Sequence, residues 1–179
     1  WGQTLVFTSR KSGADILVGK LQKAGIKADV LHRDKDQKSR RRALDAFTNG
    51  DVQVLVATDV AQRGLDIEGI SHVVNYDVPQ DADDYVHRIG RTGRAGASGT
   101  AVTFMAAQEM GLVKDIERAV GMELPRISLK GFDYDSSFLE SAQPQKEAAR
   151  TDRRSGSRMG TRNASELSPE QLRKLLKVG

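Results

Sequence analysis

The chain has 179 residues, with 28 Lys+Arg against 24 Asp+Glu and no cysteine. This length is enough for one domain with a sizeable core, and the lack of cysteine excludes disulfides and cysteine-ligated metals. Its apolar runs fall far short of the roughly 20 residues that cross a bilayer, and no secretory signal opens it. We therefore expect a cytoplasmic protein without membrane contact, and the non-methionine start at Trp1 predicts a fragment of a longer protein.

The positive charge is concentrated near the C-terminus. Residues 1–140 carry 19 Lys+Arg and 20 Asp+Glu, whereas residues 141–179 carry 9 and 4. We therefore expect any nucleic-acid contact of the folded part to use a local patch. The tail would add an electrostatic attraction that is independent of sequence.

Apolar runs alternate with segments of helical periodicity along the first two thirds of the chain. The predicted strands cover residues 4–8, 28–31, 52–57, 72–76 and 99–105. The predicted helices cover residues 14–24, 37–47, 81–89 and 108–120, the last with Met110, Val113, Ile116 and Val120 facing inward. Such alternation predicts an α/β fold, a mostly parallel sheet with helices on both faces.

The end of the chain has a different composition. We predict one domain over residues 1–130, then a flexible basic linker over 131–166, which has too few apolar residues to offset its ordering cost. Residues 167–178 predict a short amphipathic helix that opens with a capping box and proline at its first position. This helix could dock on the fold or on a protein partner.

Two segments carry the residues of greatest chemical interest. Residues 56–67 read VATDVAQRGLDI, an apolar strand that breaks into Thr58 and Asp59, and residues 87–96 read HRIGRTGRAG. Ligands of parallel sheets bind at the carboxyl ends of the strands. Glycines allow close backbone approach, and arginine forks match phosphate oxygens. The phosphate-cradling pattern G-x-x-x-x-G-K-[ST] is missing from the chain.

A cluster of three carboxylates superficially resembles a magnesium site: Asp81, Asp83 and Asp84. A metal-binding pair of this kind should follow a buried apolar strand, whereas these residues follow Pro79 and Gln80. We interpret Asp81 as a helix N-cap, with the other two in the first turn, where the helix dipole favours negative charge.

The two segments resemble motifs V and VI of the DEAD-box family of ATP-dependent RNA helicases, and we call them the motif V segment (56–67) and the motif VI segment (87–96). Residues 5–10 (LVFTSR) resemble motif IV, and Gln37 with Arg40 resembles a Gln-x-x-Arg motif. The family usually has glycine after the histidine at position 32, where this chain has Arg33. We expect His32 itself to be structural.

The resemblance implies the second, C-terminal RecA-like domain of a helicase. ATP with Mg²⁺ would be held mainly by the N-terminal RecA-like domain of the same protein, and RNA would bind across the cleft between the two domains. The residue roles that the resemblance implies are catalytic for Arg91 and Arg94, with Arg94 as the arginine finger; nucleotide-binding for Gly64, Asp66, Arg91 and Arg94; RNA-binding for Ser9, Gln37, Arg40, Thr58 and Asp59; interdomain for Arg63, His87 and Arg88; and metal-binding for none.

A second interpretation stays open. The chain could be a stand-alone RNA-binding or regulatory module without catalysis, which would suit its basic tail. In that case Arg91 and Arg94 would lack a phosphate within their own protein.

Overall fold

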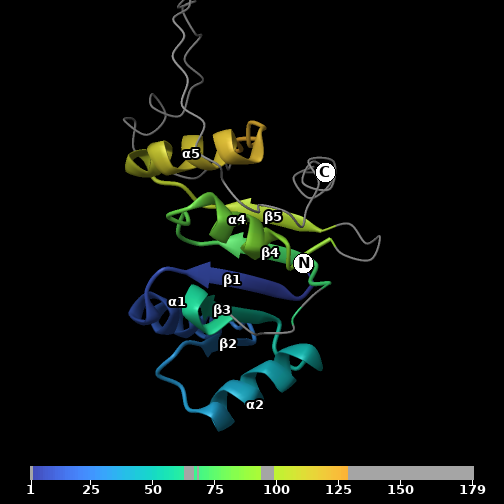
Figure 1. The fold of residues 1–179 in the computed structure, drawn as a ribbon. Coiled ribbons are helices and arrows are strands. Elements are labelled where there is room, and N and C mark those ends of the chain that lie inside the picture. The colour runs from blue at the N-terminus through green and yellow to red at the C-terminus, as the bar shows by residue number, and fades with distance from the viewer. Residues whose placement is uncertain (1, 63–66, 68, 94–98, 129–179) are drawn as a thin grey trace, which may run out of the picture.

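A five-stranded sheet forms the centre of the structure, a computed structural model that describes residues 2–62, 67, 69–93 and 99–128 (Figure 1). The strands are β1 (Thr4–Thr8), β2 (Ala28–Leu31), β3 (Val54–Thr58), β4 (His72–Asn75) and β5 (Thr100–Thr103). They are all parallel, in the order β2-β3-β1-β4-β5. The predicted parallel α/β sheet is confirmed, and all five predicted strands are present.

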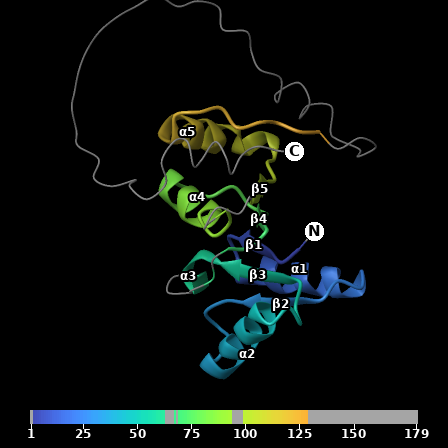
Figure 2. The same cartoon turned by 90° about the vertical axis from the view of Figure 1, so that its right-hand side faces the viewer.

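Helices cover both faces of this sheet. They are α1 (Lys11–Lys23), α2 (Gln37–Thr48), α3 (Asp59–Gln62), α4 (Ala82–Ile89) and α5 (Met110–Val120), with a short 3-10 helix η1 (Ala107–Glu109) before α5. Helix α1 lies on one side of the sheet, and α3 and α4 lie on the other (Figure 2). The sequence predicted all of them except α3, whose four residues are too few to show a helical period.

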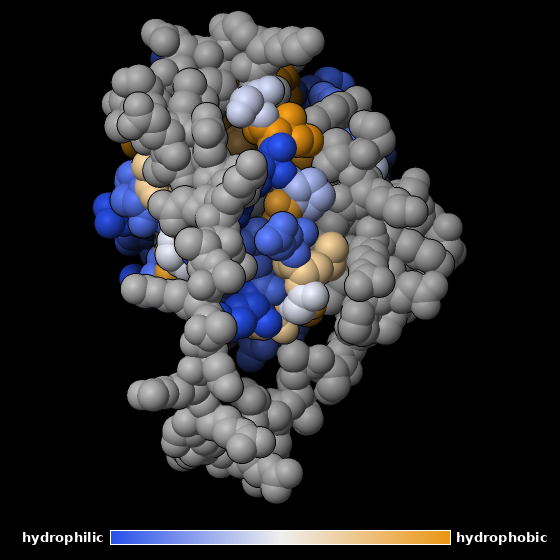
Figure 3. Space-filling view, turned by 90° about the horizontal axis from the view of Figure 1, so that it is seen from above, coloured by the Kyte–Doolittle hydropathy of each residue, from blue (hydrophilic) through white to orange (hydrophobic). Residues whose placement is uncertain are grey.

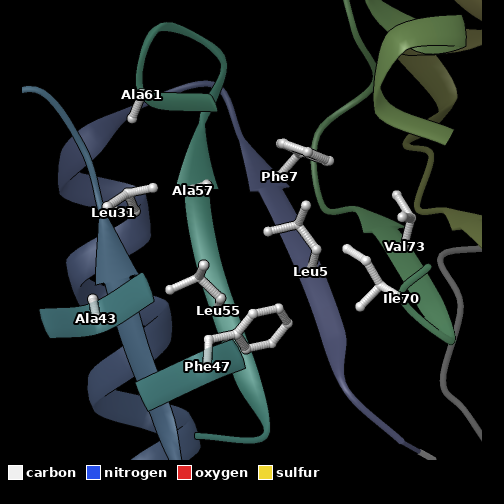
Figure 4. Packing of buried hydrophobic residues seen from close by; sticks show 10 residues of the cluster. All are labelled: Leu5, Phe7, Leu31, Ala43, Phe47, Leu55, Ala57, Ala61, Ile70 and Val73. Carbon is white, nitrogen blue, oxygen red and sulfur yellow. The ribbon is translucent and has the colours of Figure 1, made fainter. Parts of the chain in front are cut away.

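The core forms because successive strand residues point to opposite faces. Leu5 and Phe7 of β1 join a cluster with Ala43 and Phe47 of α2 (Figure 4). Val6, between them in sequence, joins a separate cluster on the α1 side. Burying one aliphatic or phenylalanine side chain contributes about 1.5–3 kcal/mol, so these clusters hold the strands that carry the site in place.

Side-chain caps begin two of the helices where the sequence predicted them. The Asp36 carboxylate accepts from the Ser39 N–H at 2.6 Å, and the Asp81 carboxylate accepts from the Asp84 N–H at 2.8 Å. The Ser39 backbone hydrogen bond is the main reason that the pKa of Asp36 lies below its usual value. Asp81 is therefore an N-cap, as its place in the sequence indicated.

Helix α5 packs against α4 through a third apolar cluster. Of the residues predicted to face inward, Val113 and Ile116 are buried, and Met110 and Val120 are half-buried. Seen from above, this end of the molecule shows hydrophilic and hydrophobic side chains next to one another where described residues are visible (Figure 3). The predicted linker (131–166) and terminal helix (167–178) lie outside the described residues. Within the described part of the chain, every helix is too short or too polar to cross a bilayer.

Candidate functional site

The motif V and motif VI segments meet at the carboxyl edge of the sheet. Strand β3 ends at Thr58, and α3 begins with the next residue, Asp59. Helix α4 comes after β4 in the chain, and Arg88 lies close to the C-terminal end of this helix. The sequence predicted this edge for Thr58 and Asp59, and the structure joins the motif VI segment to it through one side chain, that of Arg88.

Arg88 makes that junction. Its Nε and Nη2 donate to the two carboxylate oxygens of Asp59 at 2.7 and 2.6 Å. Its Nη1 donates to the Asn75 side-chain oxygen at 3.1 Å and to the Asp77 carbonyl at 3.2 Å. All three guanidinium nitrogens are thus engaged, in the paired geometry that makes arginine–carboxylate contacts strong.

The arginine of this ion pair is enclosed in the interior of the domain, and the aspartate is partly exposed. The Arg88 side chain is 2% exposed, against 26% for Asp59, and its guanidinium carbon lies 5.3 Å from the centre of the Phe7 ring, within range of a cation–π attraction. Asn75 is fully buried and donates to the Thr103 hydroxyl at 3.1 Å. Arg88 therefore links β1, the β3–α3 junction and β4 at a single point.

The sequence did not reveal that Arg88 points inward, although a signal was present. Tyr85, Arg88 and Ile89 are spaced three and four residues apart, which places them on one face of a helix, and all three are buried. The contacts of Arg88 lie within this domain, so its interdomain role stays a prediction. His87 is exposed, and its interdomain role is likewise a prediction.

The residues that the sequence assigned to the nucleotide fall partly outside the described chain. Arg91 is half-buried, and its carbonyl accepts from the Ile70 N–H at 3.2 Å. Arg91 also takes part in a further interaction within the chain. The remaining residues of this group, Gly64, Asp66 and Arg94, lie outside the described residues, as does Arg63, which the sequence predicted to be interdomain.

Four of the predicted RNA-binding residues lie at this same carboxyl edge. Ser9 follows β1, and its N–H donates to the Asp77 carboxylate at 2.7 Å. Thr58 is the last residue of β3 and Asp59 the first of α3. The Arg40 guanidinium donates to the Ala61 carbonyl at 3.2 Å, which ties α2 to α3. Gln37, the fifth, is exposed at the first position of α2.

The turn after β2 is held firmly against α1. His32 is 4% exposed, and its Nε2 lies 3.2 Å from both carboxylate oxygens of Asp15. Lys35 reaches the same carboxylate at 3.4 Å. Burial raises the pKa of Asp15, but its contacts with His32 and Lys35 outweigh burial and leave the pKa below its usual value. The exposed Arg33 lies in this turn, and its Nε is 3.7 Å from the Asp34 carboxylate.

The acidic residues of the described chain do not gather into a metal site. Neither they nor the histidines form a group of three or more that could hold a metal ion in that part of the chain. Arg40 and the Ser9 hydroxyl stand at this edge, and both carry donors suited to phosphate oxygens. This chemistry fits the phosphates of a nucleotide or of RNA.

Comparisons with known proteins identify relatives of this arrangement. Residues 1–96 match the helicase conserved C-terminal domain family. The chain is 44% identical over 146 residues to the ATP-dependent RNA helicase DBP2 of Saccharomyces cerevisiae, covering 80% of this chain and 26% of that protein. The chain therefore spans about a quarter of the length of the curated relatives it matches.

Solved structures of DEAD-box proteins share the fold. The E. coli DEAD-box protein SrmB, bound to the regulator of ribonuclease activity RraA, is 35% identical with a TM-score of 0.68, covering 83% of this chain and 82% of that one. The C-terminal domain of the DEAD-box protein Dbp5 is 38% identical with a TM-score of 0.64, covering 67% and 71%. A Dbp5 variant of S. cerevisiae bound to RNA and ADP BeF3 is 38% identical with a TM-score of 0.61, covering 65% and 32%.

Proposed function

This chain belongs to the DEAD-box RNA helicases as their conserved C-terminal, RecA-like helicase domain, and we propose that it works as one half of a two-domain enzyme that separates RNA duplexes with ATP. The N-terminal RecA-like domain of the same protein would hold most of the ATP and its Mg²⁺. This half would supply arginines for the γ-phosphate and part of the surface for the RNA backbone. We propose that the complete protein separates RNA duplexes in the cytoplasm.

One observation carries this proposal, namely the pairing of Arg88 with Asp59. It fixes the motif V segment, which we assign to RNA through Thr58 and Asp59, against the motif VI segment, which we assign to ATP through Arg91 and Arg94. The proposed RNA-binding and ATP-binding segments would therefore be held against each other by this ion pair. Ser9, Gln37 and Arg40 would extend the RNA side, and Gly64 and Asp66 the nucleotide side.

Arg91 and Arg94 would act by electrostatic stabilisation. Phosphoryl transfer spreads negative charge over the equatorial oxygens of the transferred group, and an arginine that reaches this charge speeds the reaction by about 10³–10⁵ in other nucleotide hydrolases. Arg63 and His87 would contact the first domain when the cleft closes. RNA would be read through its backbone, so binding would be largely indifferent to sequence.

The test compares RNA-stimulated ATP turnover in the complete helicase and in this chain alone. We expect Arg91→Ala and Arg94→Ala each to lower turnover by about 10³-fold, while Arg118→Ala, a matched change at an exposed arginine of α5, leaves it unchanged. The isolated chain should show almost no turnover. Turnover by the isolated chain at the rate of the complete enzyme would overturn the proposal and would favour a different use of these arginines.

A further inference from the structure

A second connection between the motif V and motif VI segments lies beyond the Arg88 pair. Thr92 is 1% exposed, and its hydroxyl donates to the carbonyl of Ile70. The two residues also form a parallel backbone bridge. Ile70 stands three residues after the motif V segment, so the chain between Asp59 and Ile70 is attached to the motif VI segment at both of its ends, by Asp59–Arg88 and by Ile70–Thr92.

Gly99 closes the other side of Thr92. A Cβ at position 99 would lie 2.0 Å from the Thr92 hydroxyl oxygen and 2.5 Å from the Gly93 backbone nitrogen. Both distances are far below van der Waals contact, and the second involves backbone, which cannot swing aside. The Thr92 hydroxyl is therefore enclosed between the Ile70 carbonyl and the Gly99 backbone.

The same connection fixes the backbone of Arg91. Its carbonyl accepts from the Ile70 N–H at 3.2 Å, and its own N–H donates to the Arg88 carbonyl at 3.2 Å. Ile70 is 4% exposed and belongs to the core cluster that includes Leu5 and Phe7 (Figure 4). Arg91 comes after the last turn of α4, yet its main chain is anchored to a buried residue of the hydrophobic core.

We propose that Thr92, Ile70 and Gly99 form a clamp that positions Arg91 toward the nucleotide. Thr92 is a positioning residue in this arrangement, because it acts through Arg91 and touches neither ligand. The inference rests on the proposed function, since it takes Arg91 to act on the γ-phosphate. A displacement of Ile70 is then carried to Arg91 through the backbone hydrogen bond between the two residues and the hydroxyl bond of Thr92.

The test is a double-mutant cycle in the complete helicase, with single-turnover ATP hydrolysis in saturating RNA as the readout. Thr92→Val removes the hydroxyl and keeps the side-chain volume, so we expect hydrolysis to slow by about 10-fold or more. Thr92→Ser keeps the hydroxyl and should stay within about threefold of the parent. When Arg91 is already alanine, Thr92→Val should cost less than about twofold, because residues that act through one another are not additive.

Each outcome decides the question. An equal slowing by Thr92→Val in both backgrounds would overturn the clamp, because it would mean that Thr92 acts through folding alone. If Thr92→Val does not fold, as shown by its circular dichroism, Thr92→Ala is carried through the same cycle with the same criteria. If Arg91→Ala leaves hydrolysis unchanged, the proposed role of Arg91 fails and the clamp fails with it. Loss with Arg91→Ala but none with Thr92→Val overturns the clamp alone.

Discussion

At the residue scale, Arg88 shows how a buried charge is accommodated. Removing a guanidinium from water is costly, and mutual attraction offsets that cost only when the geometry is good and every donor has a partner. Here Asp59, Asn75 and the Asp77 carbonyl together engage all three nitrogens. The pair therefore fixes how α3 and α4 sit relative to each other more than it adds to the overall free energy of folding.

Breaking this pair should destabilise the domain strongly. Arg88→Met leaves the Asp59 carboxylate partly buried without its counter-charge, and such losses cost about 3–5 kcal/mol. We expect urea unfolding of this chain to show a fall in stability of that order. The control is Arg118→Met, which removes the arginine of an exposed pair with Asp115 and should change stability by at most about 1 kcal/mol. Equal midpoints for the two variants would contradict a structural role for Arg88.

At the element scale, α1 offers two glycines whose replacement should have opposite effects. Gly19 lies inside the helix, and a Cβ there meets no atom within 4 Å. Gly25 follows the end of the helix with φ of 81°, a conformation that strains other residues. We expect Gly19→Ala to stabilise the domain by about 0.5–1 kcal/mol and Gly25→Ala to destabilise it by about 1 kcal/mol.

Thermal unfolding of the two variants side by side checks this prediction, and each serves as the control for the other. One change adds a methyl group to α1 and the other adds it to the turn that follows α1, so a general effect of hydrophobicity would shift both midpoints in one direction. A loss of stability in Gly19→Ala would mean that the exposed face of α1 is packed in solution.

The strands and longer helices were predictable because period and caps are local signals. The predicted third strand began at Val52, whereas β3 begins at Val54, since the Val52 and Gln53 N–H groups bond to the Ala46 and Lys27 carbonyls outside the ladder. Likewise the last predicted helix opens as a 3-10 turn, where the Glu109 carboxylate accepts from the Ala106 N–H. Both differences arise from contacts with the preceding chain.

The sequence predicted part of the location of the candidate site but not the hydrogen bonds that hold its residues together. The sequence placed Thr58 and Asp59 at the carboxyl edge, because they come at the end of a strand in a parallel sheet, but it did not place Arg88 there. The roles of Asn75 and Thr92 escaped, since each bonds a residue at least 13 positions away. Such bonds depend on the register between β4 and its neighbouring strands and on how α4 packs against the sheet. No local sequence pattern specifies either of these.

At the scale of the whole molecule, charge separates the chain into two parts with different expected behaviour. Residues 1–140 are close to neutral and residues 141–179 are basic. A near-neutral domain has no long-range attraction for RNA and must bind through the local contacts of its carboxyl edge. The predicted tail would supply the attraction over distance, and the domain would supply the geometry.

This division predicts how RNA binding depends on salt. The affinity of the chain for single-stranded RNA should fall more steeply with salt when residues 141–179 are present, because each phosphate contact releases condensed counterions. If about five of the nine basic residues contact phosphate, the slope of log affinity against log salt steepens by about 3.5.

Replacing four arginines of the tail by glutamine should remove most of that difference in slope; they are Arg150, Arg153, Arg154 and Arg158. The control is Leu172→Ala with Leu176→Ala, which should leave the difference in slope unchanged, since those leucines belong to the predicted terminal helix. Equal slopes for the whole chain and for residues 1–140 would exclude the tail as an RNA contact and leave protein docking as its use.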